Sequence, residues 1–105
     1  MIIGVGTDIV ENSRVNSKIA KRVLTEREYN IYMAKHDDLK TEYLASRFAA
    51  KEAIVKATNK QYTINQIEIL NQADGKPYSN IEGIELSISH ENNYSVAFAI
   101  YQKKV

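Results

Sequence analysis

The chain has 105 residues, with 14 basic and 13 acidic side chains, so its net charge of +1 supports no claim about a polyanionic partner. It contains no cysteine, which excludes disulfides and thiolate metal sites. The length predicts one domain, residues 1–105. No signal-peptide pattern or membrane-spanning run is present, so we expect a cytoplasmic protein with no membrane partner.

The first segment predicts a short buried strand that ends near Asp8. Ile2, Ile3 and Val5 are apolar, and Gly6 would let the backbone approach a ligand closely. An acidic residue at the end of a buried strand is costly unless it is paired or bound to a cation. Two interpretations of Asp8 therefore stay open, a cap of the next segment and a metal ligand.

A first helix is expected to begin at Asn12 or Ser13, either of which can act as its N-cap. Apolar residues then recur at every fourth position, and these are Val15, Ile19 and Val23. Another face carries four basic residues and no acid: Arg14, Lys18, Lys21 and Arg22. Such a surface suits an acidic macromolecular partner, and an ordinary solvated helix face is the alternative.

Two further helices are predicted. The segment Thr25–Glu28 has the form of a capping box, which starts a short second helix. Asp37 and Asp38 then interrupt the pattern and can cap a third, long helix. This helix is expected to run from about Lys40 to Thr58, with Asn59 as a left-handed terminator.

The long helix combines an apolar stripe with a charged pair. Leu44, Phe48 and Val55 fall on the expected core face, and the alanines beside them leave room for a close neighbour. Glu52 and Lys56 are four residues apart, so their charges lie one turn apart on the helix. The pair is either a reactive site or an ordinary ion pair on a solvated face.

The remaining chain has the two-residue period of β-strands. We expect a strand over Ile64–Leu70, a turn over Asp74–Pro77 and a C-terminal hairpin of residues 84–89 and 94–101, with residues 103–105 frayed. The predicted fold class is α+β: an N-terminal strand, three helices including one long helix, then antiparallel strands with a C-terminal hairpin.

Three segments, in this order, closely resemble the holo-acyl-carrier-protein synthase family of 4′-phosphopantetheinyl transferases. They are Gly6–Asp8, Arg47–Ala57 and Ser87–His90. The segments Arg22–Glu28, Tyr43–Phe48 and Gly75–Pro77 are also similar to that family, so the resemblance covers nearly the whole chain. One departure is the loop after the long helix, where similar proteins have a glycine-rich turn and residues 57–63 contain no glycine.

The resemblance implies the 4′-phosphopantetheinyl transferase fold and a transfer reaction. Family members move the 4′-phosphopantetheine arm from coenzyme A to a serine of apo-acyl carrier protein, in fatty acid biosynthesis, and release adenosine 3′,5′-bisphosphate. The resemblance also implies that Asp8 and Glu52 hold Mg²⁺, and that the active sites lie between the subunits of a homotrimer. Mg²⁺ prefers one or two carboxylates together with substrate phosphates, which agrees with this pair of acids.

Residue roles follow from the same resemblance. The expected catalytic residues are Asp8, Glu52 and Lys56, and the last adds a positive charge near the phosphates. The expected contacts with coenzyme A are Arg47, Lys51, Lys56, Ser89 and His90. The basic face at Arg14, Lys18, Lys21 and Arg22 would complement the acidic carrier protein. The general base is either Glu52 or a metal-bound water that Asp8 orients, and the water is the favoured hypothesis because a nearby Mg²⁺ lowers the proton affinity of Glu52.

Two other functions remain as alternatives. One is a non-catalytic trimeric module that binds coenzyme A or the carrier protein without turnover. The other is a nucleic-acid-binding domain that uses the basic helix and needs no metal. The near-neutral charge and the paired carboxylates disfavour the nucleic-acid reading, so no nucleic-acid partner is expected.

Overall fold

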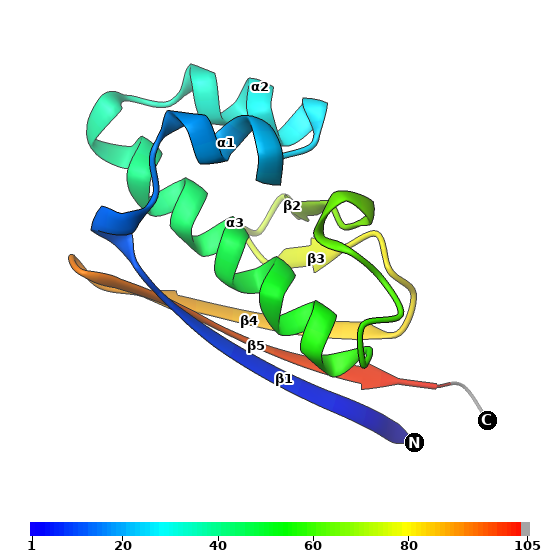
Figure 1. Cartoon of the computed structure of the whole chain (residues 1–105). Helices are drawn as coiled ribbons and strands as arrows, with labels where there is room; N and C mark the ends of the chain where they lie inside the picture. Colours follow the sequence, from blue (N-terminus) through cyan, green and yellow to red (C-terminus); the bar gives the residue numbers. More distant parts are fainter. Residues whose placement is uncertain (104–105) are drawn as a thin grey trace.

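A three-stranded antiparallel sheet and one long helix form the centre of the computed structural model, which describes residues 1–103. The strand order is β1–β5–β4, with β1 at Ile2–Glu11, β4 at Ile84–His90 and β5 at Tyr94–Gln102. Helix α3, Asp37–Ala57, lies across one face of this sheet (Figure 1). This arrangement confirms the predicted α+β class and its C-terminal hairpin.

Shorter elements cover the other side of α3. Helices α1, Ser17–Val23, and α2, Glu26–Ala34, lie on the side of α3 away from the large sheet (Figure 1). A second, two-stranded sheet pairs β2, Ile69–Asn71, with β3, Pro77–Ser79. Among residues 1–103, no helix combines the length and the apolar character needed to cross a bilayer.

Strand β1 packs so closely on α3 that two of its residues have to be glycine. A Cβ added at Gly4 would lie 1.8 Å from the carbonyl oxygen of Ala57, and one at Gly6 would lie 2.0 Å from that of Ala53. The close approach that Gly6 allows is therefore to the α3 backbone. The space beside the helix alanines is likewise filled by the sheet and not by a ligand.

Helix α3 buries most of its alanines completely, together with Leu44 and Ile54. Ala45, Ala49 and Ala53 have no exposed surface, whereas Phe48 and Val55 are only partly buried. Of the predicted core stripe of Leu44, Phe48 and Val55, only Leu44 is fully buried. The physical reason is the short distance to the sheet, which leaves room only for small side chains directly between the two layers.

Strand β5 turns its larger side chains away from α3. Ala97 and Ala99 are buried, while Val96 and Phe98 are 36% and 44% exposed. On β1, Ile9 lies opposite Val96 and is also exposed. One face of the large sheet is therefore apolar and open, and no element within residues 1–103 covers it (Figure 1).

The first helical region differs from its prediction. Strand β1 continues past Asp8 to Glu11, so Asp8 lies within the strand and not at its end. A 3₁₀ turn, Asn12–Arg14, follows, and α1 begins later with Asn16 as its N-cap. The predicted caps Asn12 and Ser13 are wrong, because Asn12 is buried and donates to backbone carbonyls of the β4–β5 turn instead.

Other boundaries shift less. The capping box of Thr25 and Glu28 is confirmed at the start of α2. Helix α3 begins at Asp37, before the predicted Lys40, and is followed by Asn59 and Lys60 with φ of 52° and 64°. The predicted strand over Ile64–Leu70 is a 3₁₀ turn, Ile64–Gln66, and then β2, while β3 was not predicted. Of the tail predicted to fray, residues 104–105 lie outside the described residues.

Candidate active site

The structure brings Asp8 and Glu52 together. Asp8 comes from β1 on the side of the sheet that faces α3, and Glu52 comes from the middle of α3. Both line one pocket of about 260 Å³, together with Arg14 and Phe48. The alternation of side chains along β1 explains this, because Gly4, Gly6 and Asp8 share one face and the two glycines bring that face against the helix.

The charges in this pocket are unbalanced around Glu52. Burial, reinforced by the negative charge of Asp8 and opposed by Lys56, raises the pKa of the Glu52 carboxyl. The Lys56 ammonium lies 3.1 Å from Asp8 Oδ1 and donates to the carbonyl of Thr7 at 2.9 Å. Asp8 therefore has a cationic partner, whereas Glu52 is destabilised in its charged form.

The donor set fits a divalent cation bound by two carboxylates. Within residues 1–103 no group of three or more histidine, aspartate or glutamate side chains is placed to form an all-protein metal site. Mg²⁺ commonly takes one or two carboxylates and completes its shell with water and substrate phosphates. A cation between Asp8 and Glu52 would also oppose the two causes that raise the Glu52 pKa, which are burial and the charge of Asp8.

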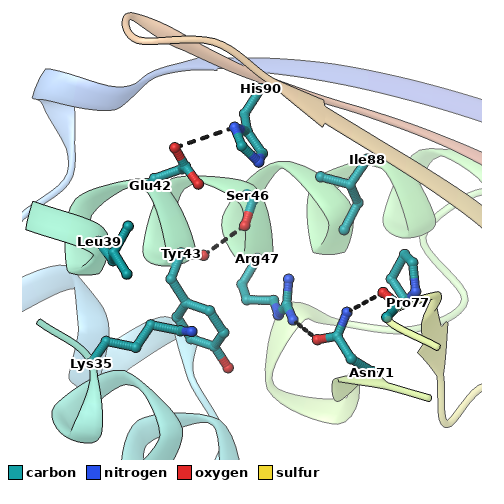
Figure 2. A pocket seen from close by; sticks show the side chains of 11 residues that line it. Lys35, Leu39, Glu42, Tyr43, Ser46, Arg47, Asn71, Pro77, Ile88 and His90 are labelled. Carbon is teal, nitrogen blue, oxygen red and sulfur yellow. Dashed lines mark hydrogen bonds and ion pairs between the residues drawn. The ribbon is translucent and has the colours of Figure 1, made fainter. Parts of the chain in front are cut away.

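Arg47 and His90 lie in a different pocket, of about 430 Å³, between α3, the end of β4 and the turn between β2 and β3. Figure 2 shows His90 pointing toward Glu42, with 3.2 Å between His90 Nδ1 and Glu42 Oε2. It also shows Arg47 directed toward Asn71, whose Oδ1 accepts a hydrogen bond from the guanidinium. The Arg47 guanidinium stacks 4.5 Å from the ring centre of Tyr43.

Arg47 has capacity for a further partner. Its side chain is 6% exposed, and its Nε is buried without a hydrogen-bond partner. A buried, unsatisfied N–H on a guanidinium that borders a pocket is suited to an anionic ligand. Tyr43, Asn71 and Glu42 were not singled out from the sequence, although Tyr43 belongs to the segment Tyr43–Phe48 that resembled the family.

Two of the residues predicted to contact coenzyme A, Lys51 and Ser89, do not line the pocket of Arg47 and His90. Lys51 is completely buried, and its ammonium is bound by the carboxylate of Glu28 at 2.5 Å and the carbonyl of Val23 at 2.7 Å. Ser89 is exposed on the open face of the sheet, on the side away from α3. Its neighbour His90 points the other way and reaches the pocket. The sequence periodicity predicted that Lys51 lies on the helix, but it did not predict that its side chain is buried.

The two pockets share no lining residue within the chain. Asp8 lies on β1 and His90 on β4, and these strands flank β5 from opposite edges of the sheet. Arg47 and Glu52 likewise approach different strands from the same helix. The two pockets therefore lie toward opposite edges of the large sheet.

An apolar groove lies beside the acidic pocket. It has a volume of about 530 Å³ and is lined by Ile19, Arg22 and Val23 of α1, Phe48 of α3, and residues 63–65. Ile19 and Phe48 line the acidic pocket as well, so the two hollows are neighbours. Lys18 and Lys21 are exposed on α1 beside this groove. Arg14 is separate from them, because it lies in the 3₁₀ turn beside the acidic pocket.

Comparison with known proteins decides the family. The family model described as the 4′-phosphopantetheinyl transferase superfamily matches residues 4–99. The chain belongs to the 4′-phosphopantetheinyl transferase superfamily. It is 40% identical to the holo-[acyl-carrier-protein] synthase of Geobacillus sp. (strain WCH70), with 98% of each chain covered. It is 35% identical to that of Petrotoga mobilis, with 95% of this chain and 96% of the relative covered.

Solved structures of superfamily members have the same fold. A holo-(acyl-carrier-protein) synthase from Bacillus anthracis, in complex with CoA (3′,5′-ADP), is 35% identical, covers 99% of both chains and has a TM-score of 0.90. The enzyme from Neisseria meningitidis is 31% identical, covers 98% of this chain and 100% of its own, and has a TM-score of 0.87. The predicted fold and the enzyme class, a phosphopantetheinyl transferase, are confirmed.

Proposed function

We propose that this transferase moves the 4′-phosphopantetheine arm of coenzyme A to a serine of apo-acyl carrier protein, with Mg²⁺, and releases adenosine 3′,5′-bisphosphate in fatty acid biosynthesis. The observation that carries the proposal is the shared pocket of Asp8 and Glu52 in a member of this superfamily. These residues are far apart in the sequence and meet only because β1 packs closely on α3.

Asp8 and Glu52 would hold Mg²⁺, and Lys56 would act beside them. When bound, the metal supplies positive charge that polarises the pyrophosphate and stabilises the leaving bisphosphate. The Lys56 ammonium lies 3.1 Å from Asp8 Oδ1, so it would add a second positive charge beside the metal and the pyrophosphate. The serine proton has two candidate acceptors, Glu52 and a water molecule that Asp8 orients.

Arg47 and His90 would bind the adenosine bisphosphate part of coenzyme A. Their pocket is bordered by cationic groups, and the Arg47 Nε has no partner. The similar enzyme from Bacillus anthracis was solved in complex with CoA (3′,5′-ADP), which supports this class of ligand. Lys51 and Ser89 are left out of this site, because one is buried in the core and the other faces away.

A homotrimer would join the two pockets. The open, apolar face of the large sheet, which includes Val5, Ile9, Val96 and Phe98, is the surface available for packing against another copy. Contact through this face would bring the β1 edge of one chain near the β4 edge of a second. Each site would then combine Asp8 and Glu52 of one chain with Arg47 and His90 of the next.

The carrier protein would dock on α1. Lys18, Lys21 and Arg22 supply positive charge that complements an acidic partner, and the apolar groove beside them can take an apolar side chain from that partner. Arg14 lies between this surface and the Asp8–Glu52 pocket. The modified serine would thus arrive next to the carboxylates.

The test is transfer itself. The chain is incubated with coenzyme A, Mg²⁺ and an apo-acyl carrier protein, and mass spectrometry should show the carrier heavier by one 4′-phosphopantetheine. The same reaction with the Asp8→Asn variant, or with EDTA, should give no added mass. A carrier protein that binds but gains no mass would favour the non-catalytic alternative, and binding of any polyanion without metal dependence would favour the nucleic-acid alternative.

A further inference from the structure

Lys51 and Glu28 form a buried ion pair in the core, and neither residue has a role in the proposed transfer reaction. Both side chains have 0% exposure, and Lys51 Nζ lies 2.5 Å from Glu28 Oε1. A buried ion pair is not by itself a reliable source of stability, because desolvation of two charges offsets much of their attraction. The structural role of the pair therefore lies in the backbone groups to which Lys51 and Glu28 are hydrogen-bonded.

Lys51 holds the α1 wall of the apolar groove. Its ammonium donates to the carbonyl of Val23, the last residue of α1, at 2.7 Å. Val23 also lines the groove, together with its neighbour Arg22 and with Ile19 one turn earlier. The position of the α1 end relative to α3 is thus set by a hydrogen bond from the side chain next to Glu52.

Glu28 holds the segment that leads to the opposite wall. Its Oε2 accepts from the backbone amide of Ile69 at 2.6 Å, and its Oε1 accepts from that of Thr25 at 2.8 Å. The groove's other wall, residues 63–65, lies just upstream of Ile69. A second connection supports the first, because Glu68 accepts a hydrogen bond from the Thr25 hydroxyl at 2.5 Å.

We propose that Lys51 and Glu28 are positioning residues that keep the two walls of the apolar groove at the separation that the acidic carrier protein requires. The inference rests on the proposed function, because it takes the carrier protein as the occupant of the groove. It assigns to Lys51 a role in carrier recognition in place of the contact with coenzyme A expected from the sequence. Neither residue touches a substrate, so their variants should affect one substrate and spare the other.

Two variants separate positioning from stability. Lys51→Met leaves the buried Glu28 charge without a cationic partner and the Val23 carbonyl without a donor, so both the Tm and carrier use should fall. Adding Glu28→Gln removes the unpaired charge, and the Tm should recover in part. The Val23 carbonyl still has no donor in the double variant, so the KM for the carrier protein should stay raised.

Steady-state kinetics gives the readout. In both variants we expect the KM for apo-carrier protein to rise about tenfold or more, while the KM for coenzyme A stays within about twofold of wild type. Leu86→Ala is the control, because it truncates a core side chain of β4 that does not line the groove. It should lower the Tm and the active fraction without changing either KM.

Each outcome distinguishes the hypotheses. A carrier KM that returns to the wild-type value together with the Tm of the double variant would overturn the positioning role, as would equal changes in both KM values. If Lys51→Met does not fold, the double variant alone carries the comparison with Leu86→Ala. A wild-type chain that transfers no arm at all would instead reject the proposed function, before any variant is compared.

Discussion

At the scale of a single residue, the charged form of Glu52 that would bind Mg²⁺ is also the form that destabilises the metal-free fold. Its raised pKa means that the folded chain binds its proton more tightly than the unfolded chain does. The stability linked to this proton is fully present below the unfolded pKa and is lost as the pH rises through the folded pKa. At neutral pH, without metal, the charged Glu52 therefore destabilises the fold.

Glu52→Gln should raise the Tm of the metal-free protein at pH 7, on the order of a few degrees, because it removes the buried charge beside Asp8. The difference should vanish below about pH 4, where the wild-type carboxyl is protonated. Addition of Mg²⁺ should raise the Tm of the wild type and not that of the variant. Thermal unfolding followed by circular dichroism measures all three effects.

Glu26→Gln is the matched control for this experiment, because Glu26 is exposed at the start of α2. It should not raise the Tm at pH 7, and it should leave the Mg²⁺ effect intact. If Mg²⁺ raised the Tm of the wild type and of Glu52→Gln equally, Glu52 would not be a metal ligand.

The exposed lysines of α1 give a second prediction at residue scale. Reversal of charge in Lys18→Glu with Lys21→Glu should raise the KM for an acidic carrier protein about tenfold or more at low salt, because the complementary surface becomes repulsive. The KM for coenzyme A should change little, since neither residue lines the pocket of Arg47 and His90. Arg14 is left unchanged here because it lines the acidic pocket.

A charge-matched control reverses two lysines that lie elsewhere, Lys60 and Lys103, both exposed. This variant should use the carrier protein as the wild type does. Equal losses in the two double variants would show that net charge, and not the α1 surface, governs the encounter.

At the scale of elements, the contact between β1 and α3 positions the acidic pair. The two layers approach until backbone meets backbone, and the glycines of β1 face helix carbonyls with no space for a Cβ. Asp8 lies two residues beyond Gly6 on the same face of the strand. Any change that separates the layers should therefore displace Asp8 from Glu52.

Gly6→Ala tests this contact. The added Cβ would lie 2.0 Å from the carbonyl oxygen of Ala53, so the strand has to move, and the free energy of unfolding should fall by about 1–3 kcal/mol or more. Because Asp8 moves with the strand, stabilisation by Mg²⁺ should also weaken. Chemical denaturation with and without Mg²⁺ gives both values, and a variant that matched the wild type in both would show that the layers adapt at no cost.

At the scale of the whole molecule, the question is how two pockets at opposite edges of one sheet act on one substrate. The Asp8–Glu52 pocket lies at the β1 edge, and the Arg47–His90 pocket lies at the β4 edge. In the proposed trimer, joint use of both pockets would draw residues from two chains, and the open apolar face of the sheet would be the surface through which copies associate.

Mixed oligomers test shared sites. Asp8→Asn and Arg47→Met chains should each be inactive alone, whereas a mixture that is unfolded and refolded together should regain roughly one quarter of wild-type activity, because random assembly leaves that share of the sites intact. Mixing the folded proteins without exchange is the control. No recovery after verified exchange of subunits would mean that each site is built within one chain.

Much of this protein could be predicted from local patterns. The capping box at Thr25 and Glu28, the long helix and the C-terminal hairpin follow from short-range rules and were confirmed. The segments that resemble the family predicted that the chain is a transferase, and the comparisons confirm this. These features depend on neighbours along the chain, so the sequence alone contains enough information to predict them.

Only the tertiary structure decided which face of each element is buried. Lys51 and Glu28 lie in the core although both are charged, whereas Phe98 is exposed although it is apolar. Helix periodicity relates residues to one another but not to the sheet, and the close approach of β1 selects alanines for the interior. The same packing decides that Asp8 meets Glu52 while Arg47 and His90 form a separate pocket, since those distances depend on layers that touch only in the folded chain.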